Sequence, residues 1–189
     1  MANIASVSYA IEGSEESLKK IAEAVVVAVN TDDNRYELYK AAEHLKLPIT
    51  DDTRLGGEIE EEPTWNEGHS TLRFSSEERW GLQDFAELLE KKFPDIKVYW
   101  VVEESGMEIY CTNDKEGKYF PERYWVDTCI DGIYNSEYFK TEEAAYKWLD
   151  RLTYGRVKSA EDVEEFNSDY EDSDDSDENW IYVHKFEVV

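Results

Sequence analysis

The chain combines a strongly acidic composition with a high aromatic content, which predicts a folded core. It carries 45 Asp and Glu against 20 Lys and Arg, a formal net charge of -25, together with 13 Tyr, 7 Phe and 6 Trp. Acidic disordered segments are poor in aromatic residues because they cannot bury enough apolar surface to order themselves. Apolar residues make up 41% of the chain. The combination therefore predicts a folded protein with a negative surface.

The charge also limits which partners the protein can have. It opposes direct binding of nucleic acid or of an anionic membrane, since both are polyanions. No segment approaches the ~20 consecutive apolar residues that span a bilayer, and residues 1–11 lack the cationic start and apolar run of a secretory signal. We expect a cytoplasmic protein without a membrane partner, for which a basic protein is the most natural partner. The sequence leaves the oligomeric state open.

Alternating and helical patterns predict one α+β domain over residues 1–189. The expected strands are 4–11, 57–65, 69–74, 97–103, 107–111, 122–130 and 180–188. Helices are expected after caps at Ser14, Asp33, Thr141 and Ser159, and another should run from Ser76 or Trp80 to Lys92. Residues 107–130 read as a hairpin with a long loop, and Asp131-Gly132 as a further turn.

The order of elements up to Glu103 indicates a particular core. Apart from one extra helix it is strand, helix, strand, strand, helix, strand, the order of the ferredoxin-like split βαβ motif. We therefore expect an α+β fold with a ferredoxin-like core and additional antiparallel strands and helices.

Residues 80–124 resemble a known family. They hold Phe93-Pro94-Asp95 at the end of a helix, then the run 99–106 (YWVVEESG), then a strand ending in Tyr110. This resembles the YubB-type ferredoxin-like domain of plasmid- and phage-associated proteins. The family opens on a segment with Trp and Cys, which residues 1–4 lack. The resemblance implies a ferredoxin-like fold and a mobile-element origin, and it implies no catalytic residue.

Residues 168–179 are dominated by Asp and Glu and should form a mobile, solvated loop before the last strand. Asp172, Asp174 and Asp177 are candidate ligands for a divalent cation, because hard cations take carboxylate oxygens. The EF-hand pattern fails, since no Gly stands at its sixth position and no Glu at its twelfth. A solvated loop with weak cation binding is the favoured interpretation.

The sequence carries no recognisable catalytic or cofactor signature. Cys111 and Cys129 are expected to be small buried residues with free thiols, although a single cross-strand bridge or a cluster with His184 is conceivable. A Gly-x-Ser-x-Gly elbow and a phosphate loop are both missing from the sequence. We expect no cofactor, and we favour a protein that is not an enzyme while leaving that question open.

Several aromatic residues should lie on the surface, because both faces of some strands carry them. The candidates are Trp65, Trp80, Tyr99, Trp125, Tyr134 and Tyr138. Exposed aromatic rings next to acids suit a basic protein through stacking and cation–π contacts. The predicted partner-binding residues are Tyr99, Trp125, Glu103 and Glu104. The alternative is that further helices or strands cover the second face of the sheet.

Three functional classes follow from these features. The first is a non-enzymatic protein-interaction module, in its sharpest form a nucleic-acid mimic that occupies a basic DNA-binding protein. The second is an enzyme or small-ligand binder, which needs a concave pocket with converging polar groups. The third is a cation-binding protein that uses the acidic segment. The acidity and the family resemblance favour the first class.

Overall fold

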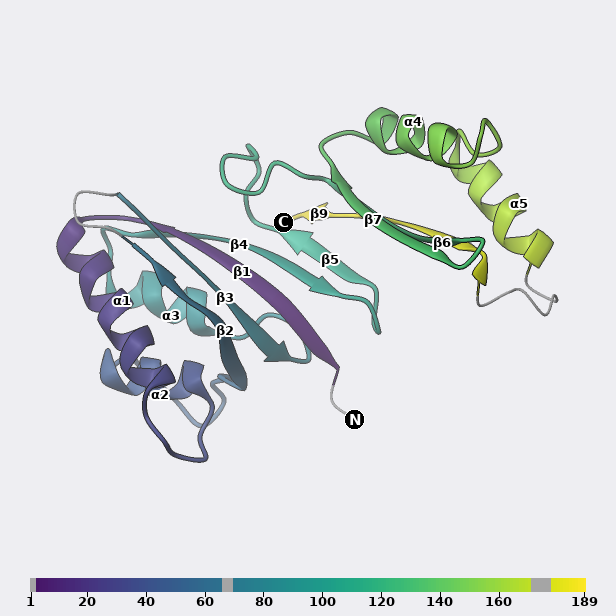
Figure 1. The fold of residues 1–189 in the computed structure, drawn as a ribbon. Coiled ribbons are helices and arrows are strands. Elements are labelled where there is room, and N and C mark those ends of the chain that lie inside the picture. The colour runs from purple at the N-terminus through teal and green to yellow at the C-terminus, as the bar shows by residue number, and fades with distance from the viewer. Residues whose placement is uncertain (1–2, 66–69, 171–177) are drawn as a thin grey trace. The chain divides into compact units, whose positions relative to one another are not determined.

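The computed structural model describes residues 3–65, 70–170 and 178–189 and divides the chain into two compact units (Figure 1). Unit 1 comprises Met1–Lys115 with Val188–Val189, and unit 2 comprises Glu116–Glu187. Each unit has its own sheet and its own apolar core, and the assignment of residues 1–189 to one domain stays a prediction. The fold is α+β, as expected. No described helix is both long and apolar enough to cross a membrane.

Unit 1 is built on an antiparallel-paired sheet of six strands in the order β2-β3-β1-β4-β5-β9. Its strands are β1 (Ile4–Glu12), β2 (Gly57–Thr64), β3 (Thr71–Arg79), β4 (Lys97–Glu104), β5 (Ile109–Thr112) and β9 (Glu187–Val188). Every second residue of β1, from Ala5 to Ile11, is fully or almost fully buried. The period of two therefore places one face of the central strand in the core.

Three helices cover that face of the sheet (Figure 1). They are α1 (Glu15–Val29), α2 (Glu37–His44) and α3 (Phe85–Lys92). The first begins where predicted, because the Ser14 side chain accepts a hydrogen bond from the Ser17 backbone N–H. Its buried stripe includes Leu18, Ile21 and Val25, which the helical spacing also predicts.

A buried carboxylate lies inside this core. Glu78 on β3 is 0% exposed, and its oxygens accept hydrogen bonds from Tyr9 Oη at 2.5 Å, Ser76 Oγ at 2.7 Å and the Gln83 N–H at 2.5 Å. Burial raises the pKa of the Glu78 carboxyl, against these hydrogen bonds, which favour its charged form. The three donors make the burial of this polar group tolerable.

Unit 2 is a sheet of three antiparallel strands in the order β7-β6-β8, with two helices on one face (Figure 1). Its elements are β6 (Tyr124–Ile130), β7 (Ile133–Phe139), α4 (Glu142–Leu152), α5 (Ala160–Tyr170) and β8 (Trp180–Lys185). Thr141 caps α4 as predicted, accepting from the Ala144 N–H at 3.2 Å. The core between sheet and helices consists of Val126, Ala145, Leu149, Val157, Phe166 and Ile181.

The first two strands of unit 2 are joined by a two-residue turn. Ile130 pairs with Ile133, so Asp131 and Gly132 alone make the connection, with φ of 52° and 73°. Two positive φ values identify the tight hairpin turn for which Asp-Gly is a preferred sequence. The turn fixes the register of the whole hairpin, from Ile130 to Tyr124.

The predicted hairpin is wrong, and one predicted helix begins later than expected, at Phe85, although it ends at Lys92 as predicted. Residues 107–130 do not form a hairpin: β5 pairs with β4 in the first sheet, while β6 pairs with β7 and β8 in the second. No helix begins at Ser76 or Trp80 either, because β3 continues to Arg79 and the positive φ of Trp80 and Gly81 ends it.

Two helix ends also differ from their predicted positions. The N-cap position of the second helix is Tyr36, which makes no side-chain capping bond, and the carboxylate of the predicted cap Asp33 instead accepts hydrogen bonds from Arg35. The last helix continues to Tyr170, into the segment that we assign to a loop over 168–179. Residues 171–177 of that segment lie outside the described residues.

Candidate functional site

The face of the second sheet that is turned away from α4 and α5 carries nine side chains in a regular grid. We call it the open face. In the register, Trp125 lies between Tyr138 and His184, Asp127 between Ser136 and Tyr182, and Cys129 between Tyr134 and Trp180. Residues that are directly opposite in an antiparallel sheet point to the same side. Six of the nine side chains are therefore aromatic if His184 is counted with the five Tyr and Trp rings.

The rings of the open face contact one another in a continuous series. Trp125 stacks on Tyr138 with ring centroids 6.0 Å apart and on His184 at 4.9 Å. His184 stacks in turn on Tyr182 at 6.1 Å, and Tyr182 lies 5.2 Å from Trp180. These spacings are typical of favourable aromatic pairs. The rings therefore support one another and form a preformed platform.

Several rings of this platform are exposed. The exposed fractions of Tyr134, Tyr138 and Tyr182 are 60%, 42% and 53%, and Trp125 and Trp180 are partly exposed. Single exposed apolar residues are ordinary, but a contiguous exposed aromatic surface marks an interaction site. The open face is therefore the best candidate for a functional surface in the described chain.

The polar groups of the open face hold the rings in place. Trp125 Nε1 donates to Ser136 Oγ at 2.6 Å. Tyr134 is hydrogen-bonded to Asp127, and this bond, with some burial and the carboxylate charge, raises the pKa of the Tyr134 hydroxyl. Asp127 Oδ1 is buried and has no hydrogen-bond partner among the described residues. Asp127 places the one full negative charge of the grid at its centre.

The structure separates the four predicted partner-binding residues. Trp125 belongs to the open face of unit 2, whereas Tyr99, Glu103 and Glu104 lie on β4 of unit 1. The ring of Tyr99 is 9% exposed and lies under Lys97 Nζ at 4.5 Å. Glu104 is 3% exposed. Its carboxylate accepts from the backbone N–H groups of the turn after β4, so it shapes that turn.

The other aromatic residues that were expected on the surface are also distributed over the two units. Tyr134 and Tyr138 join Trp125 on the open face, while Trp80 is exposed on unit 1 and Trp65 packs against the core of that unit. Alternation in the expected strand 180–188 puts Trp180, Tyr182 and His184 on one side, but no sequence pattern connects them to Trp125. The strand β7 is not among the expected strands, so the predicted elements lack one side of the open face.

The metal and cysteine candidates do not form a site in the described chain. Cys111 and Cys129 are free thiols in different sheets, and Cys129 shares the open face with His184. Within residues 3–65, 70–170 and 178–189 no group of three His, Cys, Asp or Glu side chains is arranged to hold a metal ion. The candidates Asp172, Asp174 and Asp177 lie outside the described residues.

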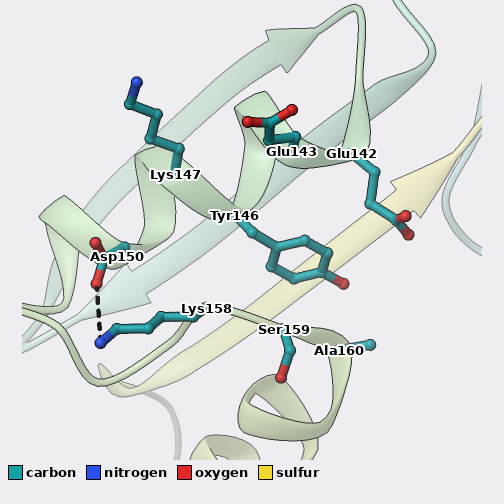
Figure 2. Close-up of a pocket in the computed structure, with 8 residues that line it drawn as sticks. All are labelled: Glu142, Glu143, Tyr146, Lys147, Asp150, Lys158, Ser159 and Ala160. Carbon is teal, nitrogen blue, oxygen red and sulfur yellow. Dashed lines mark ion pairs between the residues drawn. The ribbon is translucent and has the colours of Figure 1, made fainter.

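A hollow of about 730 Å³ lies between α4 and the start of α5 (Figure 2). Tyr146 lies across it, and Lys158 Nζ pairs with Asp150 Oδ1 at 3.8 Å. The Ser159 hydroxyl accepts the Asp162 N–H and so serves as a helix cap. The lining mixes carboxylates with ammonium groups and consists of Glu142, Glu143, Tyr146, Lys147, Asp150, Lys158, Ser159 and Ala160. These groups do not converge as a ligand pocket requires.

Comparisons with protein-family models, with curated proteins and with solved structures find no match for this chain.

Proposed function

We propose that the protein is a non-enzymatic interaction module, and that the open face of unit 2 binds a basic protein through its exposed aromatic rings. The observation that carries this proposal is the series of contacting rings from Tyr138 through Trp125, His184 and Tyr182 to Trp180. A preformed aromatic platform provides a large contact area at a low cost in side-chain entropy.

The charge of the unit selects a cationic partner. Residues 116–187 contain 20 Asp and Glu against 8 Lys and Arg. The nine residues of the open face include Asp127 and no Lys or Arg. Opposite charges speed the encounter and exclude anionic competitors. Single-stranded nucleic acid also stacks on aromatic platforms, but it needs a positively charged groove, and this face has no such charge.

Arginine and lysine side chains fit the chemistry of this face. A cation over the face of Trp or Tyr gains about 0.5–1 kcal/mol at an exposed site, and Arg is the more common partner. The carboxyl group of Asp127 lies at the centre of the open face and adds attraction for a guanidinium. The partner should therefore present several Arg or Lys side chains on one surface.

Of the functional classes that the sequence predicts, the proposal keeps the first, a protein-interaction module. Nucleic-acid mimicry stays a hypothesis of the same class, in which the basic partner is itself a DNA-binding protein. The mobile-element origin and the YubB-type resemblance stay predictions. The described residues offer no site that supports the enzymatic hypothesis or the cation-binding hypothesis.

We also propose that β1 to β4 with α1 and α3 form a ferredoxin-like core. In its support, the element order β1-α1-β2-β3-α3-β4, interrupted by α2, follows that motif. In the sheet, β3 lies between β1 and β2, as a split βαβ unit requires. The strands β5 and β9 would then be additions at one edge.

A titration with a synthetic basic peptide tests the binding proposal. The probe is a peptide in which arginine alternates with threonine, and calorimetry measures its Kd for the full chain. The double variant Tyr138→Ala/Tyr182→Ala should bind about tenfold more weakly, since two exposed cation–π contacts are lost. The control is Tyr154→Ala, because this ring is 98% exposed and lies outside the open face. Equal affinities for both variants, or tighter binding of oligothymidylate than of the peptide, would overturn the proposal.

A further inference from the structure

The outer edge of β7 adjoins the open face, and no described strand pairs with it. β7 is an edge strand of its sheet, seven residues long, and its pairing with β6 runs without a bulge from Ile133 to Phe139. It contains neither Pro nor Lys, the residues that commonly protect such edges. Five of its seven residues are exposed. A regular exposed edge is a template to which another strand can pair.

Hydrogen bonds at the opposite edge of the sheet show which backbone groups of β7 point outward. On β8, the Ile181 backbone is bonded to the Asn167 side chain, so Ile181 and its partner Thr128 form a pair without mutual hydrogen bonds. Bonded and non-bonded pairs alternate in an antiparallel ladder. Thr128 must then bond to Asn135 on β7. The backbone groups of Tyr134, Ser136 and Tyr138 therefore point away from the sheet.

The bond made by Tyr138 agrees with this assignment. Its N–H donates to the side chain of the adjacent Glu137 at 3.2 Å, a contact that is compatible with an N–H outside the ladder. The same three residues, Tyr134, Ser136 and Tyr138, have their side chains on the open face. An added strand would therefore bond to the outward backbone groups of Tyr134 and Ser136 and bring every second side chain beside the two tyrosine rings.

We propose that the basic partner binds as an extended segment that adds to β7 as a fourth strand, with Arg or Lys at alternate positions over the open face. This inference rests on the proposed function and adds its mode of binding. Backbone hydrogen bonds to β7 would supply affinity for any extended chain, and the aromatic rings with Asp127 would select cations.

A second copy of this chain is a less suitable occupant of the same edge. Two copies of unit 2 would bring together two surfaces that each carry 20 acids against 8 bases. Like charges across an interface oppose association. A cationic segment has the complementary charge, and we therefore assign the edge to a different chain.

Ser136 allows a matched test of the edge. Ser136→Pro removes an outward N–H without removing a ladder bond to β6, as Pro does when it is tolerated on an edge strand. Ser136→Ala keeps this N–H and loses the same hydrogen bond from Trp125 Nε1. With the arginine–threonine peptide, Ser136→Pro should raise the Kd about tenfold relative to Ser136→Ala. Circular dichroism checks that both variants are folded.

A second experiment modifies the peptide and leaves the protein unchanged. N-methylation at alternate backbone nitrogens blocks one edge of the peptide while keeping every side chain. One of the two alternate methylation patterns should abolish binding and the other should leave it within about twofold.

The outcomes separate the two proposals. If Tyr138→Ala/Tyr182→Ala weakens binding but Ser136→Pro and both methylation patterns do not, the aromatic face binds without strand addition and this inference is wrong. If the aromatic variant has no effect, the proposed function itself fails. A concentration-dependent dimer of the free chain that Ser136→Pro abolishes would assign the edge to a second copy, and this too would overturn the inference.

Discussion

Asn167 on α5 closes the outer edge of β8 by bonding to both backbone groups of Ile181. Its Nδ2 donates to the Ile181 carbonyl at 2.8 Å, and its Oδ1 accepts the Ile181 N–H at 2.9 Å. A carboxamide thus takes the place of a neighbouring strand, and Ile181 is fully buried. The sheet therefore has one edge closed by a side chain and one edge, β7, without such a cover in the described chain.

Asn167→Ala should destabilise unit 2 by about 1–3 kcal/mol, because it leaves the buried N–H and carbonyl of Ile181 without partners. Chemical unfolding with amide hydrogen exchange in β6 and β8 measures the change. The matched control is Asn135→Ala, whose side chain makes one exposed bond, to the Ile133 carbonyl at 3.2 Å. An equal loss of stability in the two variants would refute the role of Asn167.

Gly132→Ala should destabilise the β6–β7 hairpin by about 1 kcal/mol, because alanine resists the positive φ of the second turn residue. Its φ is 73°, and an added Cβ would lie 3.8 Å from the nearest atom, so the cost is conformational and not steric. Gly132→Asn is the control, since Asn tolerates this conformation better. Hydrogen exchange of the β6 amides measures which of the two variants destabilises the hairpin more. A larger loss for Asn than for Ala would contradict the turn assignment.

Glu78 should make the stability of unit 1 depend on pH. Its folded pKa lies above the ordinary value of 4.5 because of burial, so the folded protein holds this proton to a higher pH than the unfolded chain does. The free energy of unfolding should then fall as the pH rises from about 4.5 through the raised pKa, and the contribution should be constant above it.

Glu78→Gln isolates this effect, because glutamine has a similar shape and does not titrate. Its amide can turn its NH₂ toward the hydroxyls of Tyr9 and Ser76, which can accept, and its oxygen toward the Gln83 N–H. The stability of the variant minus that of the native protein should rise across the same pH window. A difference that stays flat, or that falls as the pH rises, is incompatible with a raised pKa.

Local signals in the sequence are sufficient to predict several of the helices and strands. Ser14 and Thr141 are predicted caps, and both accept the expected hydrogen bond. The strand 97–103 is confirmed as β4, because its run of Val, Tyr and Trp is typical of a strand. These elements are determined by residues within a few positions of one another, and for this reason the sequence predicts them.

The open face depends on pairing that the sequence does not reveal. Residues 133–139 carry apolar or aromatic side chains on both faces, so β7 has no clear alternation. The turn at Asp131-Gly132 is the available signal, because a two-residue Asp-Gly turn between strands favours a hairpin. The pairing of β8 with β6 joins residues 51 to 61 positions apart, from Cys129 with Trp180 to Tyr124 with Lys185. Long-range pairing of this kind leaves no local pattern.

The most direct test of the binding proposal is to map where a cationic chain contacts the protein. NMR chemical shifts of the full chain would be followed during a titration with the arginine–threonine peptide. The account predicts saturable changes at the indoles of Trp125 and Trp180, at Tyr182, and at the amides of β7. Changes confined to other acidic surfaces, such as the hollow beside Tyr146 or the strand Gly57–Thr64, would contradict it.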